Sequence, residues 1–157
     1  LQDTPRAAAL QMSLALEAES PLPLVAGNAD RLRQVFLNLL DNAFKYARSG
    51  DRVTISLRRA SEGIACAVCD TGPGIPPEQL AYVTRRFYRV PGTTAPGSGL
   101  GLALVAEILR RHESRLELES RTVGETGTCA RFVLPMPDDL SSGTRRARSG
   151  DRPELAP

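Results

Sequence analysis

The sequence predicts an α+β fold in which helices cover one face of a mixed, mostly antiparallel sheet. Two kinds of pattern indicate this class. Short segments alternate apolar and polar residues, as half-buried strands do, and two longer segments repeat apolar residues at helical spacing. The predicted order is strand, helix, strands, helix, strands, with tight turns between neighbouring strands, which disfavours a doubly wound parallel sheet. A chain of 157 residues, 41% of them hydrophobic, is long enough for one such domain with loose ends.

The first half of the chain is expected to hold two helices and three short strands. Ala-rich sequence after Pro5 predicts a helix over 4–19, where an early proline is favourable. A short strand is expected over 22–26. Asn28 is the predicted N-cap of a second helix that ends near Arg48. Alternation then predicts two strands joined by a tight turn: 52–58 and 63–70.

The second half begins with a loop, because residues 71–77 contain two Gly and three Pro. Residues 91–99 are again rich in Gly, Pro and Thr, which predicts no fixed element there. Apolar residues at three-and-four spacing predict a helix over 100–112. The remaining expected elements are a short helix and two closing strands: 78–83, 115–119 and 128–134.

The composition argues against several classes of function. No apolar run approaches the ~18 residues of a membrane span, and the first residues lack the basic and apolar pattern of a secretory leader. A net charge of +2 gives no general attraction to nucleic acid or anionic lipid. Aromatic residues make up only 4% and Trp is absent, which disfavours stacking of nucleic-acid bases.

The three cysteines, Cys66, Cys69 and Cys129, are an odd number, which argues against a disulfide framework and for a reducing compartment. Cys66 and Cys69 have metal-ligand spacing. They lie in a predicted strand, however, where residues three apart point to opposite faces and cannot grip one ion. Buried core cysteines are therefore expected.

The second helix carries a polar ridge formed by Asn38, Asn42 and Lys45, which follow one another at steps of four and three residues. Amide oxygens suit Mg²⁺, and a lysine beside them can meet phosphate charge. The alternative is an ordinary solvated helix face. Against it, Lys45 is the only lysine among 20 basic residues, which suggests a need for a compact charge at this position.

Asp70 ends a strand whose inward face is apolar, so its carboxylate is expected at the edge of the core. A carboxylate there needs hydrogen-bond donors, or its desolvation costs several kcal/mol. The amino group of adenine is one donor; the amides of Thr71 and Gly72 are the structural alternative. Gly72 and Gly74 let the backbone approach a flat ligand, because they have no Cβ.

The segment Gly97-Ser-Gly-Leu-Gly101 leads into a predicted helix, so its free N–H groups and the positive helix end suit a phosphate. A dinucleotide-binding fingerprint does not fit, because the spacing differs and no strand precedes the segment. No Gly-Lys-Ser/Thr follows, so it is no Walker loop either.

Together these segments resemble the ATP-binding catalytic domain of sensor histidine kinases, in the GHKL superfamily that includes gyrase, Hsp90 and MutL. The sequence from Asn38 to Tyr46 is similar to the N box, 70–74 to the G1 box, 86–89 to the F box and 97–101 to the G2 box. Gly127-Thr128 and Leu134-Pro135 are similar to the closing strand. The resemblance covers about 22–137 and implies a two-layer α/β sandwich, the Bergerat fold, with ATP between the helices and a mobile lid. We therefore expect a linker or helix over 1–20, the domain over 21–137 and a disordered tail over 138–157.

The resemblance also implies roles for individual residues. Asn42 would coordinate Mg²⁺ with support from Asn38, and Lys45 would contact phosphate. Tyr46 would pack on adenine, whose amino group Asp70 would receive with help from Thr128. Either Arg86 or Arg89 would touch the γ-phosphate, or both would be lid-surface charge. The other residues expected to contact the nucleotide are Gly72, Gly74, Ile75, Phe87, Gly97, Ser98, Gly99, Leu100, Gly101 and Leu102.

One position separates the branches of the superfamily. Where the ATPases have a glutamate that activates water, this helix has Asn38, whose amide cannot take a proton. Transfer of the phosphoryl group to a histidine is then favoured over hydrolysis. His112 is the only histidine, and the family's usual His-Gly-Gly is here His112-Glu-Ser, so His112 is expected to be structural. Thr84 replaces a frequent F-box Phe, and the segment between Phe87 and Gly97 predicts a small lid.

These residues predict the catalytic domain of a two-component sensor histidine kinase that uses Mg²⁺ and ATP. Its expected partners are a histidine-bearing dimerisation domain before Leu1 and a response regulator, with no nucleic acid. The chain alone is expected to be a monomer, its parent a homodimer anchored in the bacterial inner membrane, and the domain cytoplasmic. Two alternatives stay open. A degenerate nucleotide-sensing or docking module is favoured by the altered F box but disfavoured by the intact glycines and Asn42. An anti-sigma serine kinase is disfavoured because its N box usually differs.

Overall fold

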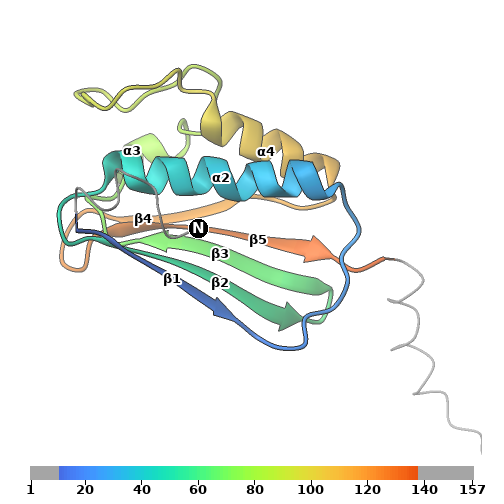
Figure 1. The fold of residues 1–157 in the computed structure, drawn as a ribbon. Coiled ribbons are helices and arrows are strands. Elements are labelled where there is room, and N and C mark those ends of the chain that lie inside the picture. Colours follow the sequence, from blue (N-terminus) through green and yellow to red (C-terminus); the bar gives the residue numbers. More distant parts are fainter. Residues whose placement is uncertain (1–10, 138–157) are drawn as a thin grey trace, which may run out of the picture.

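The computed structural model describes residues 11–137, which form a five-stranded sheet with its helices on one face (Figure 1). The strand order across the sheet is β1-β2-β3-β5-β4. Only β1 and β2 are parallel; the other neighbours are antiparallel. The predicted two-layer α+β sandwich with a mixed, mostly antiparallel sheet is confirmed. The strands are β1 (Ser13–Ala18), β2 (Arg52–Ala60), β3 (Gly63–Asp70), β4 (Glu117–Arg121) and β5 (Gly127–Pro135).

The longest helix, α2 (Ala29–Tyr46), begins where the sequence predicts it. The Asn28 side chain accepts a hydrogen bond from the Arg31 amide at 3.0 Å, which satisfies one of the free N–H groups at the helix start. Its buried stripe packs on the sheet beside α4 (Gly101–Arg111), and α3 (Pro77–Leu80) is a single short turn. The buried residues of α2 are Val35, Leu39, Leu40, Ala43 and Phe44.

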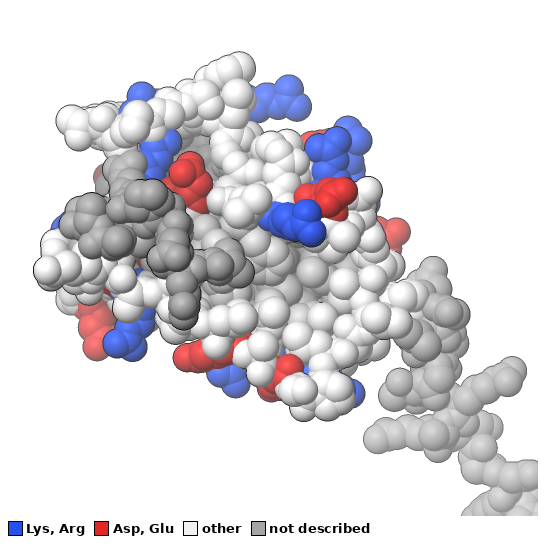
Figure 2. All heavy atoms as spheres, in the orientation of Figure 1, with Lys and Arg blue, Asp and Glu red and all other residues white. Residues whose placement is uncertain are grey.

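The hydrophobic core lies between the helix pair and the inward face of the sheet. Buried residues alternate along parts of β2, β3 and β5, as the sequence predicts. They are Val53 and Ile55, then Ile64, Cys66 and Val68, then Ala130, Phe132 and Leu134. The ring of Phe36 on α2 meets that of Phe132 on β5 with the centroids 5.5 Å apart. No helix among residues 11–137 combines the length and the apolar character that a membrane crossing requires. On the face drawn in Figure 2, acidic and basic side chains are interspersed, in keeping with a net charge of +2.

The prediction of a helix over 4–19 is wrong for the residues that the structure describes. Residues 13–18 form β1, an edge strand that pairs with β2 so that Leu14 lies beside Val53 and Leu16 beside Ile55. Pairing with a strand about forty residues away overrides the helical propensity of the Ala- and Leu-rich sequence. Residues 1–10 and the predicted tail over 138–157 lie outside the described residues.

The short strand expected over 22–26 is also absent from the structure. This segment crosses from β1 to α2 without regular structure, and the Ala26 amide donates to the Pro135 carbonyl at 3.0 Å. This hydrogen bond to the end of β5 and the packing of Leu22 and Val25 against the core hold the segment without a ladder.

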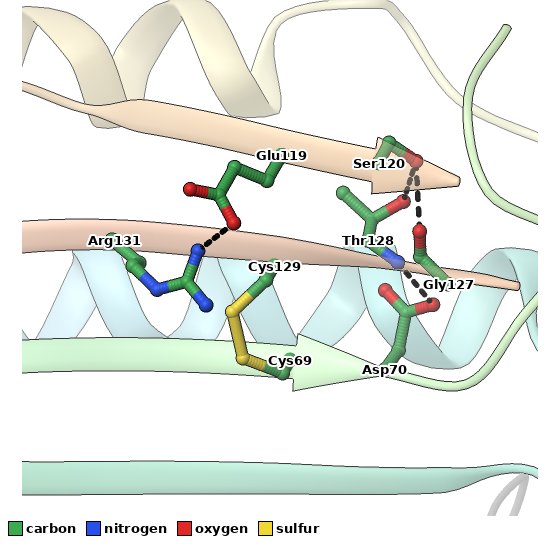
Figure 3. The surroundings of a disulfide bond; sticks show 8 residues. All are labelled: Cys69, Asp70, Glu119, Ser120, Gly127, Thr128, Cys129 and Arg131. Carbon is green, nitrogen blue, oxygen red and sulfur yellow. Dashed lines mark hydrogen bonds and ion pairs between the residues drawn. A yellow bond between two sulfur atoms is a disulfide. The ribbon is translucent and has the colours of Figure 1, made fainter. Parts of the chain in front are cut away.

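The prediction of buried core cysteines without disulfides is confirmed for Cys66 and wrong for Cys69 and Cys129. Cys66 is 3% exposed, and burial raises the pKa of its thiol to about 12. Cys69 and Cys129 face away from the helices and form a disulfide bond (Figure 3). They are directly opposite each other in the β3–β5 register, a cross-strand neighbourhood that cysteine counting cannot reveal.

Candidate functional site

A cavity of about 400 Å³ lies between the C-terminal half of α2, the start of α4, the loop after β3 and the inward face of β4 and β5. Its volume is in the range of sites that bind small molecules. Most of the residues that the sequence singles out surround it. These are Asn38, Asn42, Lys45, Tyr46, Asp70, Gly74, Ile75, Arg89, Gly97, Ser98, Gly99, Leu100, Gly101, Leu102 and Thr128.

The polar ridge of α2 faces the first turn of α4. The Asn38 Nδ2 atom donates to the Gln34 carbonyl at 2.8 Å, which holds this amide along its own helix. The Asn42 side chain makes no hydrogen bond within residues 11–137, and it lines the cavity. A Cβ on Gly101 would stand 3.6 Å from Asn38 Oδ1 and 3.7 Å from Asn42 Oδ1. The start of α4 therefore lies next to both amide side chains in the lining of the cavity.

The glycine-rich segment lies against the only lysine of the chain. A Cβ on Gly97 would fall 1.9 Å from Lys45 Nζ, so a larger residue would displace the ammonium. The φ angle of Gly97 is 149°, which L side chains rarely adopt. Lys45 Nζ also lies 5.7 Å from the centroid of the Tyr46 ring. A positive charge is therefore placed beside a segment that ends at a helix start, where anions are favoured.

Asp70 lines the same cavity from the end of β3. Its Oδ1 atom accepts a hydrogen bond from the Gly72 amide at 2.9 Å. The same atom accepts from the Thr128 amide at 3.2 Å (Figure 3). Burial raises the pKa of the Asp70 carboxyl group; the two amides oppose that shift, and the nearby Asp51 charge adds to it. Oδ2 makes no hydrogen bond with the described residues, so one oxygen of a half-buried carboxylate remains for a ligand.

Ser120 is a site residue that sequence reasoning missed. It lies on the inward face of β4, and its Oγ accepts from the Ile75 amide at 2.7 Å. The same hydroxyl donates to the Gly127 carbonyl at 2.9 Å and lies 2.9 Å from Thr128 Oγ1 (Figure 3). The available signal was a serine two residues after Leu118, at an inward position of an alternating strand.

Three of the predicted contact residues do not line the cavity. Gly72 acts through its amide on Asp70, while Arg86 is exposed. Phe87 is 72% exposed and has a φ of 65°; its amide donates to the Gly99 carbonyl at 2.9 Å. The backbone of Phe87 therefore fixes the glycine-rich segment, whereas its ring points to solvent. Lining residues that the sequence did not single out are Leu39, Asp41, Ala43, Val68, Pro73, Val83, Tyr88, Val90, Thr93, Leu104, Leu118 and Ala130.

His112 lies outside the cavity lining, at the far end of the helix pair. Its Nδ1 lies 2.8 Å from the Ile108 carbonyl oxygen, to which it donates, because a carbonyl can only accept. Its Nε2 accepts from the Asn28 amide at 3.1 Å. His112 thus joins the end of α4 to the start of α2, which agrees with the expected structural role.

Known proteins similar to this chain are signalling kinases. The family model described as "Histidine kinase-, DNA gyrase B-, and HSP90-like ATPase" matches residues 27–138. The chain is 38% identical over 130 residues to the adaptive-response sensory kinase SasA of Rippkaea orientalis. It is 43% identical over 115 residues to the signal transduction histidine-protein kinase/phosphatase MprB of Mycolicibacterium vanbaalenii. These alignments cover 80% and 71% of this chain but only 33% and 24% of those proteins.

Solved structures agree with the sequence matches. The mycobacterial sensor histidine kinase MprB superposes with a TM-score of 0.71 at 33% identity, covering 85% of this chain and 88% of that one. Full-length ShkA, solved in complex with AMPPNP, superposes with a TM-score of 0.73 at 28% identity, covering 83% of this chain and 27% of that one. The match to the MprB structure extends over nearly the whole of both chains.

Proposed function

This chain belongs to the family of histidine kinase-, DNA gyrase B- and HSP90-like ATPases, and from that premise we propose that it is the catalytic, ATP-binding domain of a two-component sensor histidine kinase. The family predicted from the four sequence boxes is confirmed by the match over residues 27–138. The curated relatives are named as sensory or signal transduction kinases, and the chain spans about a quarter to a third of their length.

The observation that carries the proposal is the division of one cavity into two chemically different sides. One side offers Asp70, a carboxylate with one oxygen engaged by two backbone amides and the other available. The other side offers Lys45 beside the glycine-rich segment at the start of α4. The carboxylate is a hydrogen-bond acceptor that suits the amino group of a base. The cation and the helix-start amides suit a phosphate chain.

The residues present also fit a bound Mg²⁺ held together with phosphate. Asn42 has an amide oxygen free of other partners in the described residues, and amide and phosphate oxygens are ligands that Mg²⁺ accepts. No group of three or more His, Cys, Asp or Glu side chains within residues 11–137 could hold a metal. Asn42 would therefore act with phosphate and water, as is usual for Mg²⁺.

Bound ATP supplies the γ-phosphoryl group. The P–O bond to the leaving ADP breaks and a P–N bond forms to a histidine nitrogen. The residues of this chain bind and orient the nucleotide, and Asn38 cannot remove a proton from water, which disfavours hydrolysis. Both ring nitrogens of His112 are engaged, so the acceptor histidine would belong to a separate dimerisation domain. A response regulator would take the group next. We further propose that the chain alone is monomeric and that this domain works on the cytoplasmic side of a membrane-anchored homodimer.

Titration calorimetry with AMPPNP tests the proposal. We expect Mg²⁺-dependent binding to the native chain in the micromolar range, about −8 kcal/mol. Asn42→Ala should abolish the Mg²⁺ dependence while the far-UV circular dichroism stays unchanged. Gln34→Ala is the matched control, because Gln34 lies on the same helix outside the cavity lining and should bind as the native chain does.

The same binding experiment, followed by a phosphotransfer assay, distinguishes a kinase domain from a docking module. The docking alternative keeps some support from the exposed Phe87 ring and from Thr84. Binding by the native chain, followed by phosphorylation of an added histidine-bearing dimerisation domain, supports the kinase. Binding without transfer supports a nucleotide sensor, and no binding at any Mg²⁺ concentration contradicts the proposal.

A further inference from the structure

We propose that Ser120 determines base specificity by turning Thr128 into an obligate hydrogen-bond acceptor, so that the base side of the cavity selects a purine with an amino group on C6. This inference rests on the proposed nucleotide binding and goes beyond it to a residue outside the predicted set. Ser120 does not line the cavity, so it is a positioning residue that acts through Thr128.

The argument begins with the single proton of the Ser120 hydroxyl. A serine hydroxyl can donate once and accept twice. Its three partners here are the Ile75 amide, the Gly127 carbonyl and the Thr128 hydroxyl, at 2.7, 2.9 and 2.9 Å. The Ile75 amide can only donate and the Gly127 carbonyl can only accept. The proton of Ser120 is therefore given to Gly127.

Ser120 has no second proton, so its contact with Thr128 is a hydrogen bond only if the Thr128 hydroxyl donates. This is the one arrangement in which all three contacts are hydrogen bonds. Thr128 has only one hydroxyl proton, so that proton is directed away from the cavity. Its Oγ1 meets a ligand with lone pairs alone. Asp70, whose Oδ1 receives the Thr128 amide at 3.2 Å, likewise offers lone pairs at Oδ2. Side-chain acceptors without donors therefore form the polar edge of this side.

The close packing of the loop after β3 keeps Ser120 in this arrangement. A Cβ on Gly74 would stand 2.0 Å from the Arg121 carbonyl oxygen and 3.2 Å from Ser120 Oγ. The loop backbone thus rests directly on β4, and no water-sized gap separates Ile75 from the serine. The Ser120 hydroxyl is held by the Ile75 amide on the loop and by the Gly127 carbonyl on β5. No other rotamer of the serine side chain would keep both hydrogen bonds.

Two neighbouring acceptors distinguish purines by the group on C6. The amino group of adenine has two N–H donors and can satisfy both Asp70 Oδ2 and Thr128 Oγ1. Hypoxanthine has a carbonyl oxygen at the same position, which would face these acceptors without a proton between them. A site built for an N–H donor rejects an analogue that lacks it strongly, because its own polar groups are left unpaired.

Calorimetry with ADP and IDP tests this, since neither nucleotide carries a γ-phosphate that could be consumed. The native chain should prefer ADP by at least about 100-fold. Ser120→Ala frees the Thr128 proton to turn toward the base, so the ADP preference should fall by about tenfold or more. When Thr128 is replaced by Val, the hydroxyl that Ser120 orients is absent. Ser120→Ala should then leave the ratio of the ADP and IDP affinities unchanged.

A merely structural role for Ser120 gives a different result. Ser120→Ala would then weaken the binding of ADP and of IDP by the same factor, and it would do so equally when Thr128 is replaced by Val. That result would overturn the proposal. Should Ser120→Ala fail to fold, the native chain still decides. N6-methyl-ADP has one N–H instead of two, so it should bind about tenfold more weakly than ADP, and N6,N6-dimethyl-ADP more weakly again. Equal binding of these nucleotides contradicts the proposal, whereas absence of ADP binding contradicts the proposed function itself.

Discussion

The two sides of the cavity are built in different ways. On the side of Asp70, Ser120 and Thr128, side chains on three strands and the loop after β3 are joined by five hydrogen bonds. The side of Lys45 also includes lining residues from the segment 84–100, and this segment contains no helix or strand. It is held to itself by scattered bonds, such as those from the Phe87 amide to the Gly99 carbonyl and from Arg89 to the Ala95 carbonyl.

From this difference we expect the binding site to combine a half that is preformed with a half that gains order on binding. The side of Asp70 has its hydrogen bonds made within the protein, so ligand binding there orders little. Residues 84–100 depend on few backbone bonds, and the ordering of such a segment costs part of the binding free energy. We therefore expect recognition of the base to depend on geometry and retention of the phosphates to depend on closure.

Gly127→Ala should have the largest effect on the fold. Gly127 has a φ of 149°, and a Cβ there would lie 2.0 Å from the Asp70 carbonyl oxygen, a backbone atom that cannot move without separating β3 from β5. We expect the free energy of unfolding to fall by about 3 kcal/mol. Urea denaturation measures it, and a loss below about 0.5 kcal/mol would mean that this side is not preformed.

Gly97→Ala is the matched change on the other side. Its φ is also 149° and its Cβ would lie 1.9 Å from Lys45 Nζ, but the end of a lysine side chain can move aside. We expect the free energy of unfolding to change by less than about 1 kcal/mol. The affinity for AMPPNP should fall by about 100-fold, because the displaced ammonium no longer meets phosphate. Equal losses of stability in the two glycine variants would remove the contrast.

Amide hydrogen exchange should resolve the two sides in the unliganded chain. The amides of Gly72, Ile75 and Thr128 donate to side chains of the preformed side and should exchange slowly. Amides within 91–99 should exchange rapidly and become protected when AMPPNP and Mg²⁺ are added. Slow exchange over 91–99 without ligand would show that this side is ordered in advance.

Asp70→Asn should have the smallest effect on the free energy of unfolding, and the substitution should stabilise the fold slightly rather than destabilise it. Burial raises the pKa of Asp70, so its ionised form is disfavoured in the native state. A raised pKa contributes stability below the unfolded value of about 4, and this stability is lost as pH rises through the folded pKa. The asparagine keeps an oxygen for both amides. We expect the variant at pH 7 to be as stable as the native chain or slightly more so, with the difference vanishing near pH 3. Thermal denaturation at the two pH values measures it, and a clear loss of stability at pH 7 would contradict the role of desolvation.

Much of this arrangement was predictable because it is encoded within single segments. The Asn28 cap, the buried stripe of α2 and the ridge from Asn38 to Lys45 depend on spacing within one helix. What failed depends on partners distant in sequence. β1 is a strand because β2 lies beside it, and Ser120 matters because Ile75 and Gly127 meet there. The Cys69–Cys129 bond likewise depends on the register of β3 with β5, which no local pattern specifies.

The disulfide has a topological consequence. Cys69 and Cys129 are separated by 60 positions, so the bond closes a covalent ring that contains the loop after β3, α3, residues 84–100, α4 and β4. A peptide bond cut anywhere in that ring leaves a single molecule. Protease cleavage within 91–99 would therefore yield one species on a non-reducing denaturing gel and two fragments after reduction. The segment that faces the preformed side can be severed while both of its anchoring ends stay attached to the same molecule.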